Sequence, residues 1–178
     1  MKRLFLVAMM CIALVSLLAA PAVMAAPSGK AIPASNVLSN VYLYPKEYAD
    51  APEWTTLYEA NAWGKYNYKL VDTTISGPFN GHGLAPNTDY TLISYNDPWA
   101  TPFVIIGSGV SDELGDVHIK GTADLGFDEP SPVYDWSGDG DGYKIWLVLT
   151  EDITGFQFNA WNPGAYLFEN NRIGATAP

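Results

Sequence analysis

The chain has 178 residues, of which 19 are acidic and 9 are basic, and its formal net charge is −10. This acidity argues against nucleic acid and anionic membrane surfaces as partners, because both would repel the protein. The single cysteine, Cys11, lies in the N-terminal segment, so we expect no disulfide bond in the rest of the chain.

The N-terminal segment has the pattern of a secretory signal peptide. Two basic residues precede an apolar run from Leu4 to Ala20, and small residues follow it up to Ala25. We predict a signal helix over residues 1–25 and cleavage after Ala25, with an uncleaved membrane anchor as the alternative. Cleavage would leave seven basic against nineteen acidic residues, a net charge of −12. We therefore expect an extracellular or cell-surface protein that does not contact the membrane after cleavage.

Residues 26–39 are small, polar and proline-bearing, and we expect a flexible lead-in to a single domain over residues 40–178. Apolar and polar residues alternate over short runs in that domain, whereas no run keeps a helical period over three turns. The strands expected from this alternation cover residues 41–44, 54–58, 63–70, 75–79, 89–95, 103–106, 117–120, 143–150 and 166–168.

Three of these segments support more specific expectations. Residues 46–53 are polar, and we expect a loop or a helical turn there. Gly77 and Pro78 indicate that the strand containing them is an edge strand or carries a bulge. The strand over residues 143–150 is almost wholly apolar or β-branched, which is typical of a central strand.

A turn followed by a strand gives the clearest architectural signal, in the pattern Leu84-x-Pro86-x-Thr88-x-Tyr90. Pro86 suits an early turn position, and a tyrosine just past the turn can bury its ring and return its hydroxyl to upstream backbone. The pattern resembles the tyrosine corner of fibronectin type III domains. It implies an all-β fold, an immunoglobulin- or fibronectin III-like antiparallel β-sandwich of seven to nine strands.

A second resemblance extends from Trp54 to Ile173. It rests on segments such as Ile106-Gly107-Ser108-Gly109, Lys144-Ile145-Trp146-Leu147-Val148 and Trp161-Asn162-Pro163-x-x-Tyr166-Leu167-Phe168-Glu169. In their order along the chain, these segments resemble an uncharacterised secreted domain of surface proteins from methanogenic archaea. The resemblance implies an extracellular location, and it brings no catalytic residues with it.

Asp135, Asp139 and Asp141 alternate with glycine and are the candidate metal ligands, since carboxylates on a tight backbone can surround Ca²⁺. The EF-hand pattern is not met, because Val148 stands where a bidentate glutamate is required. The alternative is a solvated turn in a protein without a cofactor. A zinc site shared by the two histidines, His82 and His118, is disfavoured, because His118 alternates with apolar neighbours and should face solvent.

Six tryptophans suggest ligand binding as well as packing. We expect Trp54, Trp63 and Trp146 to pack within the domain. The other three, Trp99, Trp136 and Trp161, lie in loop-like segments, where exposed rings beside polar side chains could stack on sugars.

These observations predict a non-catalytic secreted or cell-envelope structural or interaction module, with an envelope protein or a polysaccharide as its partner. The alternative is a carbohydrate-binding module that uses the loop tryptophans. A small secreted hydrolase with paired carboxylates is a third hypothesis, although the sequence has no Gly-x-Ser-x-Gly or His-Glu-x-x-His motif.

Overall fold

The computed structural model describes residues 38–50, 53–95, 103–125, 143–171 and 173. The predicted signal segment and nearly all of the lead-in lie outside these residues. Within them, no helix has the length and apolar character needed to cross a membrane.

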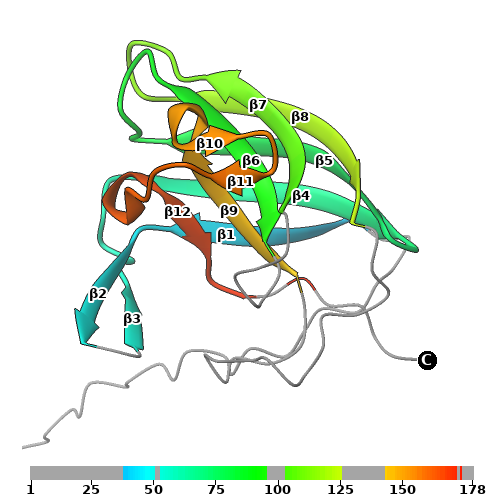
Figure 1. Cartoon of the computed structure of the whole chain (residues 1–178), viewed down its shortest axis with the longest axis horizontal. Helices are drawn as coiled ribbons and strands as arrows, with labels where there is room; N and C mark the ends of the chain where they lie inside the picture. Colours follow the sequence, from blue (N-terminus) through cyan, green and yellow to red (C-terminus); the bar gives the residue numbers. More distant parts are fainter. Residues whose placement is uncertain (1–37, 51–52, 96–102, 126–142, 172, 174–178) are drawn as a thin grey trace, which may run out of the picture.

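Eight antiparallel strands form one sheet in the order β7-β6-β9-β12-β1-β4-β5-β8. The strands are β1 (Ser39–Tyr44), β4 (Trp63–Val71), β5 (Thr74–His82), β6 (Asp89–Tyr95), β7 (Val104–Val110), β8 (Val117–Asp124), β9 (Lys144–Leu149) and β12 (Leu167–Glu169). The first and last strands of this order, β7 and β8, follow one another in the chain and lie side by side (Figure 1). The sheet therefore curls until it is nearly closed.

Two small hairpins accompany the sheet, together with the short 3₁₀ helices η2 (Thr150–Asp152) and η3 (Pro163–Ala165). One hairpin pairs β2 (Lys46–Asp50) with β3 (Glu53–Thr56), and the other pairs β10 (Ile153–Thr154) with β11 (Gln157–Phe158). Figure 1 shows the β2–β3 hairpin projecting from the rest of the molecule. The expected loop over residues 46–53 is therefore wrong in part, because β2 gains a partner strand in β3, whose tryptophan and threonines favour extended backbone.

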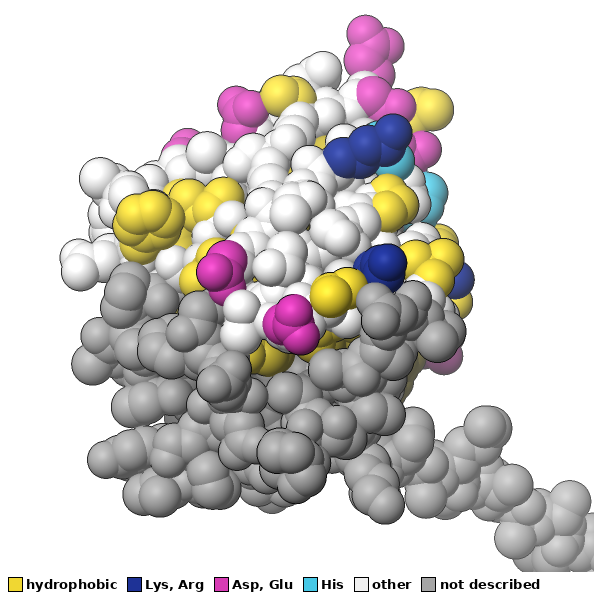
Figure 2. Space-filling model, turned by 90° about the vertical axis from the view of Figure 1, so that its right-hand side faces the viewer, with side chains coloured by type: hydrophobic (Ala, Val, Ile, Leu, Met, Phe, Trp, Pro, Cys, Tyr) yellow, Lys and Arg dark blue, Asp and Glu magenta, His cyan; other side chains and the backbone are white. Residues whose placement is uncertain are grey.

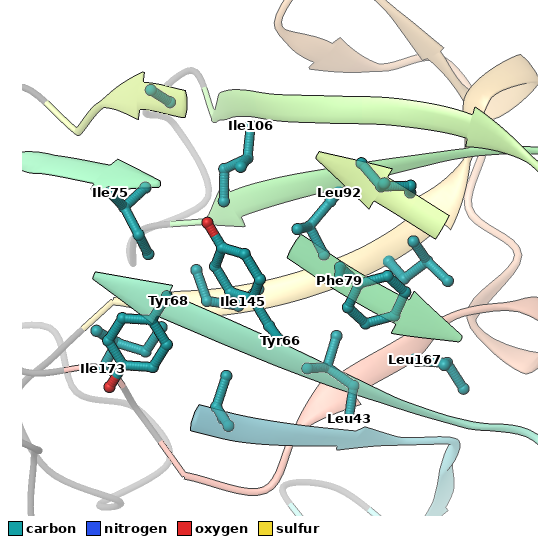
Figure 3. Packing of buried hydrophobic residues seen from close by; sticks show 14 of the residues in the cluster. Leu43, Tyr66, Tyr68, Ile75, Phe79, Leu92, Ile106, Ile145, Leu167 and Ile173 are labelled. Carbon is teal, nitrogen blue, oxygen red and sulfur yellow. The ribbon is translucent and has the colours of Figure 1, made fainter. Parts of the chain in front are cut away.

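The interior of the curled sheet holds the main hydrophobic core, to which each large strand contributes alternate residues. Leu43, Tyr66, Phe79, Leu92 and Ile145 are all buried there (Figure 3). These side chains come from five different strands, so burying them holds the curled sheet together.

The outer face of the sheet is divided into a covered half and an open half. Over β6, β9 and β12, a second cluster that includes Ile93, Trp146 and Phe168 packs beneath Ile153 and Phe158 of the β10–β11 hairpin. The outward side chains of β1, β4, β5 and β8 are half-buried or exposed. The outer surface of β1, β4, β5 and β8, which we call the open face, is therefore accessible to solvent, whereas that of β6, β9 and β12 is covered.

The structure confirms the predicted all-β antiparallel class and the central position of the strand over residues 143–150. That strand is β9, between β6 and β12, and its side chains enter both clusters. The finer prediction, an immunoglobulin-like sandwich of two sheets, is not confirmed, because hydrogen bonds join all eight strands in one sheet.

The expectation of an edge strand at Gly77 and Pro78 is wrong, since β5 lies between β4 and β8. The register to β4 is the same on both sides of these residues, so no bulge separates them. A Cβ atom on Gly77 would lie 2.0 Å from the carbonyl oxygen of Asn67. Glycine is therefore needed for close approach to β4 and is no sign of a sheet edge.

Candidate functional site

Most of the site residues predicted from the sequence lie outside the described part of the chain. They are Trp99, Trp136, Asp135, Asp139 and Asp141. A calcium site and a site formed by three loop tryptophans therefore stay predictions. Among the described residues, no group of three or more His, Cys, Asp or Glu side chains could hold a metal ion.

The predicted corner is described in full. Tyr90 and Leu84 are buried, and the Tyr90 hydroxyl accepts a hydrogen bond from the Ala85 N–H at 3.2 Å. The Thr88 hydroxyl donates to the carbonyl oxygen of Pro86 at 3.0 Å. These contacts lie within the turn, and they fix the path of the chain as a tyrosine corner requires.

The corner is also bound to the hairpin between β7 and β8. The buried Ser111 hydroxyl donates to the Ala85 carbonyl oxygen at 2.6 Å and accepts from the Thr88 N–H at 3.0 Å. The Leu84 N–H donates to the carbonyl oxygen of Gly115, whose φ of 82° requires glycine. Since β5 ends directly before this corner, the same contacts fix the end of β5.

Five ring side chains form a stripe at that end of the open face, and we call them the aromatic platform: Tyr42, Tyr44, Tyr58, Trp63 and His82. Successive ring centroids are separated by 4.6 Å (His82 to Trp63), 6.3 Å (Trp63 to Tyr42), 6.4 Å (Tyr42 to Tyr44) and 5.0 Å (Tyr44 to Tyr58). Neighbouring rings from His82 to Tyr44 are inclined by 35° or less. The stripe thus crosses three strands as a nearly continuous ring surface.

Strand pairing brings these rings together from distant parts of the sequence. Trp63 of β4 is opposite His82 of β5, while Tyr42 of β1 is opposite Lys65 of β4. Gly64 and Tyr66, at the alternate positions of β4, are buried, so alternation turns Trp63 and Lys65 outward.

Polar groups hold and flank the rings. Nδ1 of His82 lies 2.9 Å from Oδ1 of Asp116, which fixes the orientation of the imidazole. Nζ of Lys65 lies 5.3 Å from the ring centroid of Tyr42, within the range of a cation–π contact. Burial raises the pKa of Tyr44, with smaller contributions from its neighbouring tyrosines Tyr42 and Tyr58.

A polar row lies beside the rings on the same face. Asn80 of β5 is opposite Lys65 on one side and His118 on the other. Oδ1 of Asn80 lies 2.7 Å from Nδ1 of His118, which is exposed as the sequence predicted. The two histidines therefore have different partners, Asp116 and Asn80, and share none. Figure 2 shows His and Lys side chains beside hydrophobic ones along one edge of the molecule.

Trp161 is the one predicted loop tryptophan that the structure describes, and it is 43% exposed. Its ring centroid lies 5.4 Å from those of Phe158 and Tyr166 and 5.9 Å from that of Trp146. Trp54, 38% exposed, contacts it edge to face at 6.5 Å. Trp161 is therefore part of the packed cover over β9 as well as accessible to solvent.

Asp152 holds the loop that carries Trp161. Its carboxylate is buried and accepts hydrogen bonds from the Tyr166 hydroxyl at 2.6 Å and from the Asn162 side-chain amide at 2.8 Å. Its carbonyl oxygen accepts from the N–H groups of Asn159 and Ala160. One buried residue thus organises this loop, through both its carboxylate and its backbone carbonyl.

The sequence analysis missed the aromatic platform, since it expected Trp63 to pack and placed His82 in a turn. One signal could have revealed part of it. Trp63 has the same strand parity as Lys65, Asn67 and Lys69, so period-two alternation turns it toward solvent with the lysines.

No protein-family model matches this chain, and neither does any curated protein or solved structure. The likeness to secreted domains of methanogen surface proteins thus stays a prediction. The function has to be inferred from the geometry of the open face.

Proposed function

We propose that this protein is a non-catalytic, exported or envelope-associated module that binds polysaccharide on its aromatic platform. The observation that carries this proposal is the stripe of rings from His82 through Trp63 to Tyr44, which is only partly buried and has polar groups along its border. The proposal also includes the finer fold prediction, in which the sheet acts as an immunoglobulin-like scaffold. Like one face of a sandwich, the curled sheet would present the stripe on strands that are held in place by their neighbours.

The chemistry of the stripe suits a sugar chain. An aromatic ring can cover the apolar face of a sugar, and the ring edge leaves the sugar hydroxyls to neighbouring polar groups. Here those groups are the Lys65 ammonium, the Asn80 amide and the Asp116 carboxylate. Several rings in line favour an extended polymer over a single sugar, because each ring can meet a different unit.

Rigidity also supports this placement. Four of the five rings, all but Tyr58, stand on strands that pair on both sides, and His82 is held by Asp116 at the end of β5. A preformed surface binds with a smaller loss of conformational entropy than a loop that must become ordered. This argument supports the platform as the sugar-binding surface.

The test is a Trp63→Ala variant, compared with Trp161→Ala as the matched control. Both remove one partly exposed tryptophan, from the platform and from the loop cover respectively. Binding to a panel of insoluble and soluble polysaccharides is measured by pull-down and by titration. We expect Trp63→Ala to weaken binding about fivefold to tenfold, since one stacked ring contributes on the order of 1–1.5 kcal/mol, and Trp161→Ala to leave it unchanged.

The opposite result, with Trp161→Ala losing binding, would move the site to the loop tryptophans. No binding to any polysaccharide by the native chain would refute the proposal. A thermal melt of each variant shows whether it is folded, and Trp63→Phe, which retains a ring, should keep part of the affinity.

A second candidate function is protein interaction through the exposed pair Trp54 and Trp161. Their rings meet at 88° at the junction of the β2–β3 hairpin with the loop cover. Aromatic anchors of this kind are typical of protein interfaces. Capture of an envelope protein that Trp54→Ala abolishes and Trp63→Ala does not would favour this function.

A further inference from the structure

We infer that the polysaccharide is acidic, with its sugar rings on the aromatic platform and its anionic groups on three lysines of the same face, which we call the lysine strip: Lys65, Lys69 and Lys120. This inference rests on the proposed function and specifies its ligand. It starts from the uneven distribution of charge over a strongly acidic protein.

The chain has 9 basic and 19 acidic residues, yet the three lysines of the strip point outward on the open face from β4 and β8, the strands on either side of β5. Lys65 and Lys69 belong to β4 and Lys120 belongs to β8, with β5 between them. Lys65 is opposite Asn80, Lys69 is opposite Ser76, and Lys120 is opposite Pro78. The middle strand therefore contributes no charge between the lysines.

The carboxylates nearest in sequence to the lysine on β8 are Asp116, which directly precedes the strand, and Asp124, at its end. Asp116 contacts His82, and Oδ1 of Asp124 accepts a hydrogen bond from the Thr73 hydroxyl at 2.7 Å. Among the described residues, no salt bridge involves a lysine of the strip. A polyanion could therefore bind these ammonium groups without first breaking a salt bridge to a protein carboxylate.

Lys65 links the lysine strip to the aromatic platform. Its ammonium lies over the Tyr42 ring, so a charged group and a ring surface face the same volume of solvent. An acidic sugar offers the complementary pair, an apolar ring face and an anionic substituent on one unit. A neutral sugar would use only the rings.

Like charges gathered on one surface also repel each other until an anion binds. The attraction between these ammonium groups and an anionic polymer is screened by salt beyond roughly 8–10 Å at physiological ionic strength. Binding of an acidic polymer should therefore weaken with added salt, whereas ring stacking should not.

The experiment compares the purified full chain with two double variants of equal charge change. Lys69→Gln/Lys120→Gln neutralises the strip while sparing Lys65 and its ring contact, and Lys46→Gln/Lys144→Gln is the matched control outside the open face. The ligands are polygalacturonate, dextran sulfate and neutral dextran, each titrated at low and at high salt. Comparing polygalacturonate with dextran sulfate shows whether the lysines bind carboxylate groups or sulfate groups.

We expect at least one acidic polymer to bind in preference to dextran, with an affinity that falls about tenfold in the strip variant and less than about twofold in the control. Equal binding of dextran and acidic polymers, with no effect of the strip variant, would overturn this inference and leave the proposed function intact. Absence of any binding would overturn both. Acidic binding that survives Trp63→Ala but not the strip variant would overturn the proposed function and leave a purely electrostatic site.

Discussion

At the scale of single residues, Tyr90 shows how one hydroxyl can define a turn. Its ring is buried, and its oxygen is the acceptor for the Ala85 N–H. Tyr90→Phe removes that acceptor and leaves a backbone N–H without its partner. We expect the free energy of unfolding to fall by about 1 kcal/mol, measured by urea denaturation, while polysaccharide binding is unchanged.

Tyr66→Phe is the matched control for that prediction. Tyr66 is fully buried, and among the described residues its hydroxyl has no hydrogen-bond partner. In Figure 3 this hydroxyl points toward Ile106 across the core. Removing it should leave the free energy of unfolding unchanged or raise it by up to ~1 kcal/mol. If both variants lost equal stability, the Tyr90 hydrogen bond would not be the cause.

At the scale of elements, the loop from Asp152 to Tyr166 depends on one carboxylate. Asp152→Asn replaces an acceptor-only group with an amide that must direct a donor toward either the Tyr166 hydroxyl or the Asn162 amide. We expect a loss of roughly 1.5–3 kcal/mol in stability, the usual range for hydrogen bonds to a charged group. The emission of Trp161 should shift toward that of a solvated tryptophan.

The control for this element is Glu151→Gln. Glu151 is adjacent in sequence but exposed. It should change neither the melt nor the tryptophan emission. An Asp152→Asn protein with native stability and native emission would show that the loop is held by its ring contacts alone.

Elements were far more predictable from the sequence than the site was. Alternation located the half-buried strand around Tyr66, whereas the strands around Tyr90 and Ile145, buried on both faces, show as short apolar and β-branched runs. The aromatic platform depends on which strands are neighbours, for example on β4 placing Trp63 beside His82 of β5. Strand order is decided by long-range packing, and no local pattern in one sequence reports it. Most of the predicted loop ligands lie outside the described residues and stay predictions.

At the scale of the whole molecule, the buried tyrosines predict alkaline unfolding. Burial raises the pKa of Tyr68 to about 12, and it also raises the pKa values of Tyr66, Tyr90 and Tyr166 above the ordinary 10.0. In the unfolded chain these groups lose their protons near pH 10, while the folded protein keeps them. The unfolded state then binds fewer protons, so stability is complete below about pH 10 and falls as pH rises toward about 12.

The measurement is denaturant unfolding at a series of alkaline pH values, with phenolate absorbance followed in parallel. We expect exposed tyrosines to ionise first and the buried group to ionise together with unfolding. Ionisation of all 11 tyrosines near pH 10 in a protein that stays folded would contradict this prediction.

The pairing of β1 with both β4 and β12 has a consequence for the order of folding. Strands β1, β4, β5 and β8 form one side of the sheet and β6 with β7 the other, and β9 with β12 stands between them. During synthesis the two sides emerge long before the strands that join them. Until β9 is available β6 keeps an unpaired edge, and until β12 is available β1 does; unpaired edges are where unfinished sheets associate with other chains. The C-terminal strands thus close the sheet and, in doing so, protect it from aggregation.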